Sequence, residues 1–279
     1  MIHLGILLCI YVMLTISLNL SVGFTGLLNL GHIAFFGIGA YASALLVLHG
    51  YPLWIGILGA ALIAGLVGAL LAVPTSRLKG DYLALATLGF LFIMGTIARN
   101  WTGLTRGPLG LPGIPRYTAE NQTLLIIAAV TALAMTGIIW IITRTRFGKT
   151  LQAVRDDELA TQMLGKNTFA HKIASMGLSA LLAGIAGSFF AHYISFIDPS
   201  IFSSGDTILV FSMLIVGGLA SVPGSLLGAT IILLIPEPLR FIGFPSALVG
   251  PMREMLFALI LLLILIYRPK GIFGKVDFQ

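Results

Sequence analysis

The sequence has little charge. Asp, Glu, Lys and Arg make up only 9% of its 279 residues, whereas hydrophobic residues make up 58%. Apolar runs of about 17–25 residues are long enough to cross the hydrocarbon layer as helices, and such runs recur along the whole chain. The polar stretches between them are too short for a soluble domain of useful size. We therefore expect a single membrane domain over residues 1–279.

Cysteine is nearly absent, and so are the motifs of enzymes. The single Cys9 excludes a disulfide or a cysteine metal cluster within the chain. Gly148-Lys149-Thr150 resembles the end of a phosphate loop, but Thr143 stands where the first glycine is needed. The first apolar run lacks the basic region and cleavage site of a signal peptide, so we expect it to remain as a span. The sequence thus predicts no catalytic residues, no metal and no cofactor.

The centres of the predicted spans carry no ionisable Asp, Glu, Lys or Arg. Proton-coupled carriers usually hold such groups at membrane depth, so energy for transport is expected to enter elsewhere. The sequence predicts an all-α polytopic transmembrane bundle with discontinuous helices. Seven runs are predicted to span: Leu4–Leu20, Ile33–Leu48, Leu53–Val73, Tyr82–Ala98, Thr123–Ile142, Ile173–Tyr193 and Met252–Tyr267. Two shorter runs, Thr207–Leu219 and Ser225–Ile235, bring the total to eight or nine crossings, depending on whether each of them spans.

One long polar stretch, residues 144–172, interrupts the apolar sequence. Its six basic residues indicate a cytoplasmic position, because Lys and Arg near span ends are retained inside. Two more between the third and fourth spans and three after the last span fall on the same side, which gives 11 of the 16 Lys and Arg residues. The C-terminus is therefore expected inside and the N-terminus outside. These basic residues are Arg144, Arg146, Lys149, Arg155, Lys166, Lys172, Arg77, Lys79, Arg268, Lys270 and Lys275.

The polar stretch is predicted to fold as two short helices beside the membrane. Phe147, Leu151 and Val154 share one face of the first helix, and Asp156 or Asp157 can cap the second. Gly165 offers a left-handed end. The second helix then presents a small apolar surface, Leu159, Met163 and Leu164, which we call the apolar knob. A solvated loop touching lipid headgroups is the alternative, although the acids at 156–158 disfavour contact with anionic lipid.

Glycine and polar residues interrupt the apolar sequence after the first span. Backbone that is broken at membrane depth is tolerated where protein or a wet cavity satisfies its polar groups, and discontinuous helices often line transport paths. Close helix packing through small residues is the alternative explanation. We favour a translocation path that is lined by Gly23, Gly26, Asn29, Gly31 and His32.

Six segments carry a resemblance that extends over nearly the whole chain: GFTGLLNLGHIAFFGIGAYASALL, RLKGDYLALATLGF, TRGPLGLPGIP, FGKTLQAVRDDELATQMLGKN, GGLASVPGSLLGA and RPKGIFG. Together they resemble the M-type permease subunit of the branched-chain amino acid ABC importers. The chain lacks the extra leading segments that some members carry, which leaves the number of crossings open. The combination is specific for the family, but urea and amide importers have related permeases.

The resemblance implies a multi-pass subunit of the bacterial inner membrane. Its partners would be a sister permease of the H type, two cytoplasmic ATP-binding subunits and a soluble substrate-binding protein outside. Leu151–Gly165 then resembles the coupling helix that sits in a groove of the ATPase. Within it, the apolar knob would be buried, and Arg155, Asp156, Asp157 and Glu158 would set the register as rim charges.

Three functions remain for comparison with the structure. The first is an ATP-driven importer of branched-chain or other small neutral amino acids, and the related urea or amide permease is its variant. The second is a stand-alone Na⁺-driven carrier, which would need no ATPase. The third is an intramembrane enzyme, disfavoured by the lack of a catalytic set. Nucleic acid is not an expected partner. The net charge of +6 comes mostly from segments that are expected to be cytoplasmic, so it is explained by the orientation of the chain in the lipid bilayer.

Overall fold

The computed structural model describes residues 2–78, 80–118, 120–235, 246–268 and 270–274, without the side chains of 246–251, 253, 254 and 265. The first half of this part contains α1 (Ile2–Asn19), a π-helical turn η1 (Leu20–Phe24), α2 (His32–Leu48), α3 (Leu53–Thr75), α4 (Asp81–Asn100), α5 (Thr102–Thr105), a 3₁₀ turn η2 (Gly107–Leu109) and the short strand β1 (Leu111–Pro112). Each long helix lies within a few residues of a predicted span.

The second half continues with α6 (Asn121–Arg144), α7 (Arg146–Asp156), α8 (Glu158–Met163), α9 (Thr168–Ile194), β2 (Phe196–Ile197), η3 (Pro199–Ile201), α10 (Ser204–Gly217), α11 (Val222–Leu234) and α12 (Ser246–Tyr267). The two strands pair antiparallel. The predicted all-α bundle is thus confirmed.

Six helices within the described residues are long and apolar enough to cross a membrane: Ile2–Phe24, Leu53–Thr75, Asp81–Asn100, Asn121–Arg144, Thr168–Ile194 and Pro199–Gly217. α2, α11 and the segment 255–264 are apolar but shorter. The chain is therefore a multi-pass membrane protein, and eight or nine crossings stays a prediction. Lys79 and Lys275, which entered the charge count, lie outside the described residues.

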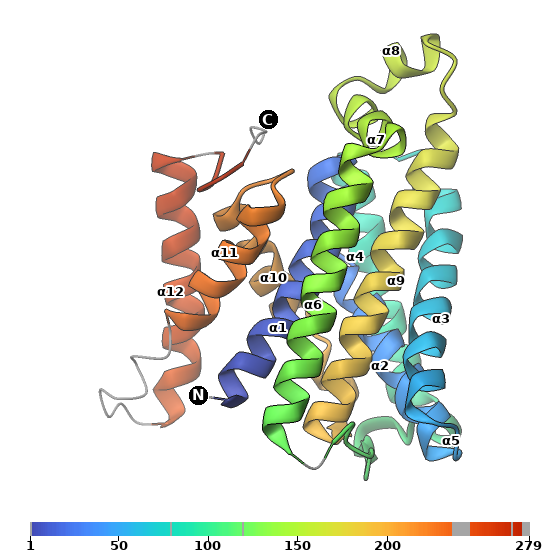
Figure 1. Cartoon of the computed structure of the whole chain (residues 1–279), viewed down its shortest axis with the longest axis vertical. Helices are drawn as coiled ribbons and strands as arrows, with labels where there is room; N and C mark the ends of the chain where they lie inside the picture. Colours follow the sequence, from blue (N-terminus) through green and yellow to red (C-terminus); the bar gives the residue numbers. More distant parts are fainter. Residues whose placement is uncertain (1, 79, 119, 236–245, 269, 275–279) are drawn as a thin grey trace.

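α1 lies at the centre of the molecule although it comes first in the chain (Figure 1). It contacts α6 and α9 on one side and α10 and α11 on the other. Met13, Leu14, Ile16 and Leu18 are fully buried there. This all-round burial is what a helix that is hydrophobic on every face requires. α1 is therefore positioned to connect the two flanks of the bundle.

α9 packs most closely against α2 and α3, and small residues make that packing possible. A Cβ atom on Gly39 would collide with the backbone of Gly184, and one on Gly184 would lie 2.7 Å from the Cβ of Ala64. Close backbone approach through small residues is the usual way in which helices associate in lipid. Gly39 and Gly184 thus allow α2 and α9 to pack closely.

α7 and α8 project from one end of the bundle, and α5 lies at the other end (Figure 1). The loop after α3 reaches the α7–α8 end, because the carbonyl oxygen of Ser76 accepts a hydrogen bond from Nζ of Lys172. α12 also ends on that side (Figure 1). The structure thus gathers the described basic segments predicted to be cytoplasmic at one end of the molecule.

Candidate functional site

The site consists of α7, α8 and the parts of the bundle that they contact. Thr145 caps α7, since its hydroxyl accepts a hydrogen bond from the backbone N–H of Gly148. Leu151 and Val154 are buried, as expected for an inward apolar face, and Phe147 is half-buried and stacks on His171. Leu151 and Val154 therefore contact this chain and do not form part of its exposed docking surface.

α8 begins where the sequence predicted a second helix. The carboxylate of Asp157 accepts the backbone N–H of Ala160 at 3.0 Å, so Asp157 is the cap of the two candidates. Gly165 has a φ of +75°, the predicted left-handed end. The apolar knob is exposed: Leu159 by 62%, Met163 by 87% and Leu164 by 79%. A cluster of exposed apolar residues ringed by charge is typical of a contact surface.

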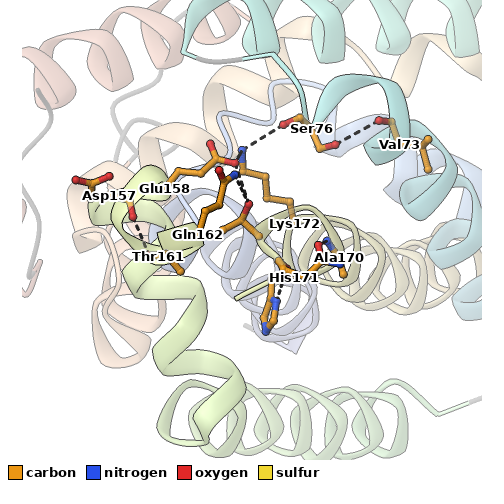
Figure 2. A network of polar contacts seen from close by, with 11 residues as sticks. Val73, Ser76, Asp157, Glu158, Thr161, Gln162, Ala170, His171 and Lys172 are labelled. Atoms are coloured by element: carbon orange, nitrogen blue, oxygen red, sulfur yellow. Dashed lines mark hydrogen bonds and ion pairs between the residues drawn. The ribbon is translucent and has the colours of Figure 1, made fainter. Parts of the chain in front are cut away.

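An ion pair holds α8 against the bundle (Figure 2). Nζ of Lys172 lies 2.6 Å from Oε1 of Glu158 and donates to the carbonyl oxygen of Ser76 at 3.2 Å. The hydroxyl of Thr168 donates to Glu158 at 3.3 Å and accepts from Gln162 at 2.8 Å. Glu158 thus faces the bundle, and Lys172 joins α8, α9 and the loop after α3.

Arg155 also faces inward, with only 14% of its side chain exposed. Its Nη1 donates to the carbonyl oxygen of Gly23 at 2.8 Å, and its Nη2 lies 2.8 Å from the carboxylate of Asp156. The side chain of Asp156 is itself exposed. Among the four residues predicted as rim charges, Asp156 and Asp157 lie at the surface, and Arg155 and Glu158 connect the polar segment to the bundle.

The structure breaks the chain between α1 and α2, where glycines predicted a discontinuous helix. Residues 25–31 are irregular, and the hydroxyl of Thr25 bonds to Ser175 of α9 at 2.6 Å. The backbone N–H of Leu30 donates to the hydroxyl of Thr87 on α4 at 3.0 Å. A side chain of α4 thus satisfies one backbone group of the irregular segment, and α9 bonds to one of its side chains.

The residues predicted to line the path are mostly internal. His32 is buried between Ser17, 2.8 Å from its Nε2, and Asn29, 3.5 Å from its Nδ1. Oδ1 of Asn29 is buried with no partner among the described residues. Gly23 is buried beside Asn19, and Gly31 lies against the backbone of Thr87. Asn29 and His32 therefore lie together, and the role of all five residues in transport stays a prediction.

Gly26 lines a polar cavity of about 210 Å³ between the break and the α7–α8 segment. Arg155, Asp156, Asp157, Glu158 and Lys172 supply its charged walls. The cavity brings one predicted path residue to the same place as five predicted coupling residues, because Val154 also lines it. The two predicted sites are thus adjacent.

Sequence reasoning missed the roles of Lys172 and Asn19. Lys172 was counted only as a basic residue, because no local spacing links it to Glu158 across 14 positions. The Asn19 amide bonds to the turn that joins α10 and α11, about 200 residues away: it accepts from the N–H of Ala220 and donates to Ser221 and Ser225. The sequence offered one indication of this role, because Asn19 is a polar residue at the end of an apolar span.

No group of three or more His, Cys, Asp or Glu residues able to hold a metal ion occurs in the described part of the chain. An apolar groove of about 330 Å³ also lies between α2, α3 and α4. The site therefore consists of an exposed surface that a partner protein can contact, the apolar knob, and of polar contacts that join this segment to the bundle.

Comparison with known proteins identifies the family of the chain. Residues 1–265 match the model of a family described as the permease component of branched-chain amino acid transport systems. The high-affinity branched-chain amino acid transport system permease protein LivM of Salmonella typhimurium is 30% identical, over 94% of this chain and 67% of that protein. The autoinducer 2 import system permease protein LsrC of Escherichia coli is 25% identical, over 92% of this chain and 72% of that one.

Among solved structures, PsaBC from Streptococcus pneumoniae in complex with Fab has a chain that matches with a TM-score of 0.51 and 17% identity. The match covers 96% of this chain and 91% of that chain. At this identity the likeness concerns the fold alone.

Proposed function

The chain belongs to the family of permease components of branched-chain amino acid transport systems, and on that premise we propose that it is the membrane subunit of an ATP-driven importer. Its substrates would be branched-chain or other small neutral amino acids. It would lie in the bacterial inner membrane, with α7 and α8 in the cytoplasm, and pair with an H-type permease. Two ATP-binding subunits would dock from the cytoplasm, and a substrate-binding protein would deliver from outside.

The exposed apolar knob supports this proposal best. Leu159, Met163 and Leu164 project from the end of the bundle, and the Glu158–Lys172 ion pair and the buried face of α7 hold them in place. A few exposed apolar anchors on a firmly held element are typical of an interface whose energy is concentrated in a small patch. A mobile, solvated loop would need no such anchoring.

Movement of the knob by a partner would reach α6 and α9, because α7 follows α6 after a single residue and Lys172 lies in the first turns of α9. ATP binding in the partner would tilt these two helices and switch the path near Gly23–His32. No ionisable acid or base at the centre of a span is needed for such a gate. A zwitterionic substrate could be matched by backbone dipoles of the broken helix.

Asn29 and His32 are our candidates for substrate contact. Both are buried in the present conformation, so the path would have to open for them to act. The unpartnered Oδ1 of Asn29 supports the proposal, because a buried acceptor without a donor is costly unless a ligand or water supplies one. Uptake that is unchanged by alanine at both positions would reject them.

The identity of the substrate is a separate part of the proposal. One relative is named for branched-chain amino acids and another for autoinducer 2, so family membership allows more than one substrate class. Competition of leucine, isoleucine and valine for uptake of a labelled amino acid would support the proposed class. Competition by urea or an amide alone would favour the alternative within the same family.

The docking proposal is tested by Met163→Asp in the transporter assembled with its ATP-binding subunits. A charge at the centre of the knob should lower ATP-dependent uptake about tenfold or more, because hot-spot residues are worth 2 kcal/mol or more. Met163→Leu keeps an apolar surface at the same position and should retain uptake. Insertion is checked by the amount of chain in the membrane.

Equal uptake by the aspartate and leucine variants would remove the knob from the mechanism. Uptake by the purified chain alone, in vesicles under a Na⁺ gradient, would instead support the stand-alone carrier.

A further inference from the structure

The end of α1 and the π-helical turn η1 that continues it are contacted from both sides by parts of the chain that are distant in sequence. On one side, Arg155 of α7 donates to the carbonyl oxygen of Gly23. On the other, the side chain of Asn19 accepts the N–H of Ala220 at 3.0 Å and donates to the carbonyl oxygen of Ser221 at 3.0 Å. The polar segment and the α10–α11 turn are thus bonded to the same helical turn.

Two of these contacts are close enough to require glycine. A Cβ atom on Gly23 would collide with Oδ1 of Asn19 and lie 2.6 Å from the N–H nitrogen of Ala220. One on Gly26 would lie 2.8 Å from Cγ of Arg155. Two glycines therefore let Arg155, the π-helical turn and Asn19 touch in series. Because packed interiors are stiff, a displacement at one end of this series is passed to the other.

The α10–α11 turn is held on its far side as well. The backbone N–H groups of Ile272 and Phe273 donate to the carbonyl oxygens of Val216 and Gly217 at 3.1 and 3.0 Å. Ala220 has a φ of +56°, an unusual conformation for a residue with a side chain, and a hydrogen bond from its N–H to Asn19 helps to hold it. A shift of Asn19 would therefore act on a constrained turn.

We propose that Arg155 is a positioning residue: it transmits the displacement of the knob through Gly23 and Asn19 to the α10–α11 turn. This inference rests on the proposed function and adds a route within the chain. An arginine suits the role because its guanidinium stays charged and offers several donors in fixed directions. The last carbonyl groups of a helix lack partners within it, so the oxygen of Gly23 is available to be gripped.

The first experiment measures amino acid imported per ATP hydrolysed by the assembled transporter. Arg155→Gln removes the cation and shortens the side chain, and it should lower this ratio about 5- to 150-fold, the range of typical coupling free energies. Arg155→Lys keeps a cationic donor and should recover part of the ratio. Arg146→Gln makes the same change on the exposed side of α7 and should leave the ratio unchanged.

The second experiment tests the route with a double-mutant cycle. Asn19→Ser withdraws the amide from the α10–α11 turn, and Ser225→Ala is the milder variant, since it removes the partner of a single 2.7 Å bond to Asn19. Residues that act in series are non-additive. Each variant combined with Arg155→Gln should therefore lower the ratio little further than the more damaging single change does.

Each outcome decides a different question. A normal ratio in Arg155→Gln, while Met163→Asp abolishes uptake, would overturn the inference and leave the proposed function standing. Effects of Arg155 and of Ser225 that multiply independently would overturn the route through Asn19. Normal uptake by Met163→Asp would reject docking at the knob, and the inference would fall with it.

Discussion

At the scale of single residues, the polar contacts decide how firmly the exposed segment is attached. Lys172 and Glu158 form an ion pair that is largely shielded from water, and Lys172 also bonds to the loop after α3. Removing one partner of a shielded pair leaves the other charge without compensation, which costs more than removing both. The pair thus sets the register of α8 against the bundle.

We expect Lys172→Met to lower the free energy of local opening of α8 by about 1–3 kcal/mol, because the Glu158 carboxylate loses its partner. Hydrogen exchange of the amides of residues 161–164 reports this opening. Lys166→Met removes an exposed lysine nearby and should change it little. The double change Lys172→Met with Glu158→Gln should cost less than Lys172→Met alone. If the double change costs as much free energy as the two single changes Lys172→Met and Glu158→Gln added together, the argument from an uncompensated charge is contradicted.

The sequence indicated residue types better than residue partners. The knob, the Asp157 cap and the Gly165 end follow from local spacing, because each depends on residues within one or two turns. Arg155 looked like a rim charge, since nothing local shows that its guanidinium reaches Gly23, 132 positions away. Partners of that kind are set by how the long helices pack, which residue patterns near Arg155 do not encode.

At the scale of elements, glycine determines which helices approach closely. α9 lies against α2 and α3 through Gly184, whereas a Cβ atom on Gly137 of α6 would meet nothing within 4 Å. Both residues are helical glycines within apolar spans, so from the sequence they look alike. Only the packing shows which one is needed, and this is why helix positions were predictable and helix neighbours were not.

Gly184→Ala should lower the free energy of unfolding of the purified protein by about 1–3 kcal/mol, the usual cost of forcing extra atoms into a packed contact. Thermal unfolding of the purified variants measures the difference. The added methyl group would lie 2.5 Å from the carbonyl oxygen of Ala60. Gly137→Ala is the matched control, and it should leave stability equal or higher because alanine favours the helix. If Gly184→Ala were as stable as Gly137→Ala, the close approach of α9 to α3 would not depend on glycine at position 184.

At the scale of the whole molecule, the distribution of basic residues and the fold agree. The segments that carry Arg77, Lys172 and Arg268 all lie at the end from which α7 and α8 project, and α5 lies at the other end (Figure 1). The positive-inside rule assigns the first end to the cytoplasm. The fold itself is compatible with either orientation, so the orientation needs its own measurement.

Two single-cysteine variants test it, in a background where Cys9 is replaced by alanine. Arg146→Cys lies on the exposed side of α7, and Leu109→Cys lies in η2, where the native side chain is 75% exposed. A membrane-impermeant maleimide added to intact spheroplasts should label Leu109→Cys and not Arg146→Cys, and permeabilisation should expose both. Because η2 and α7 lie at opposite ends of the same bundle, the reverse labelling pattern would show that the whole molecule has the opposite orientation in the membrane. It would then place the knob where a cytoplasmic ATPase has no access, and an ATP-driven mechanism through α8 would be excluded by topology alone.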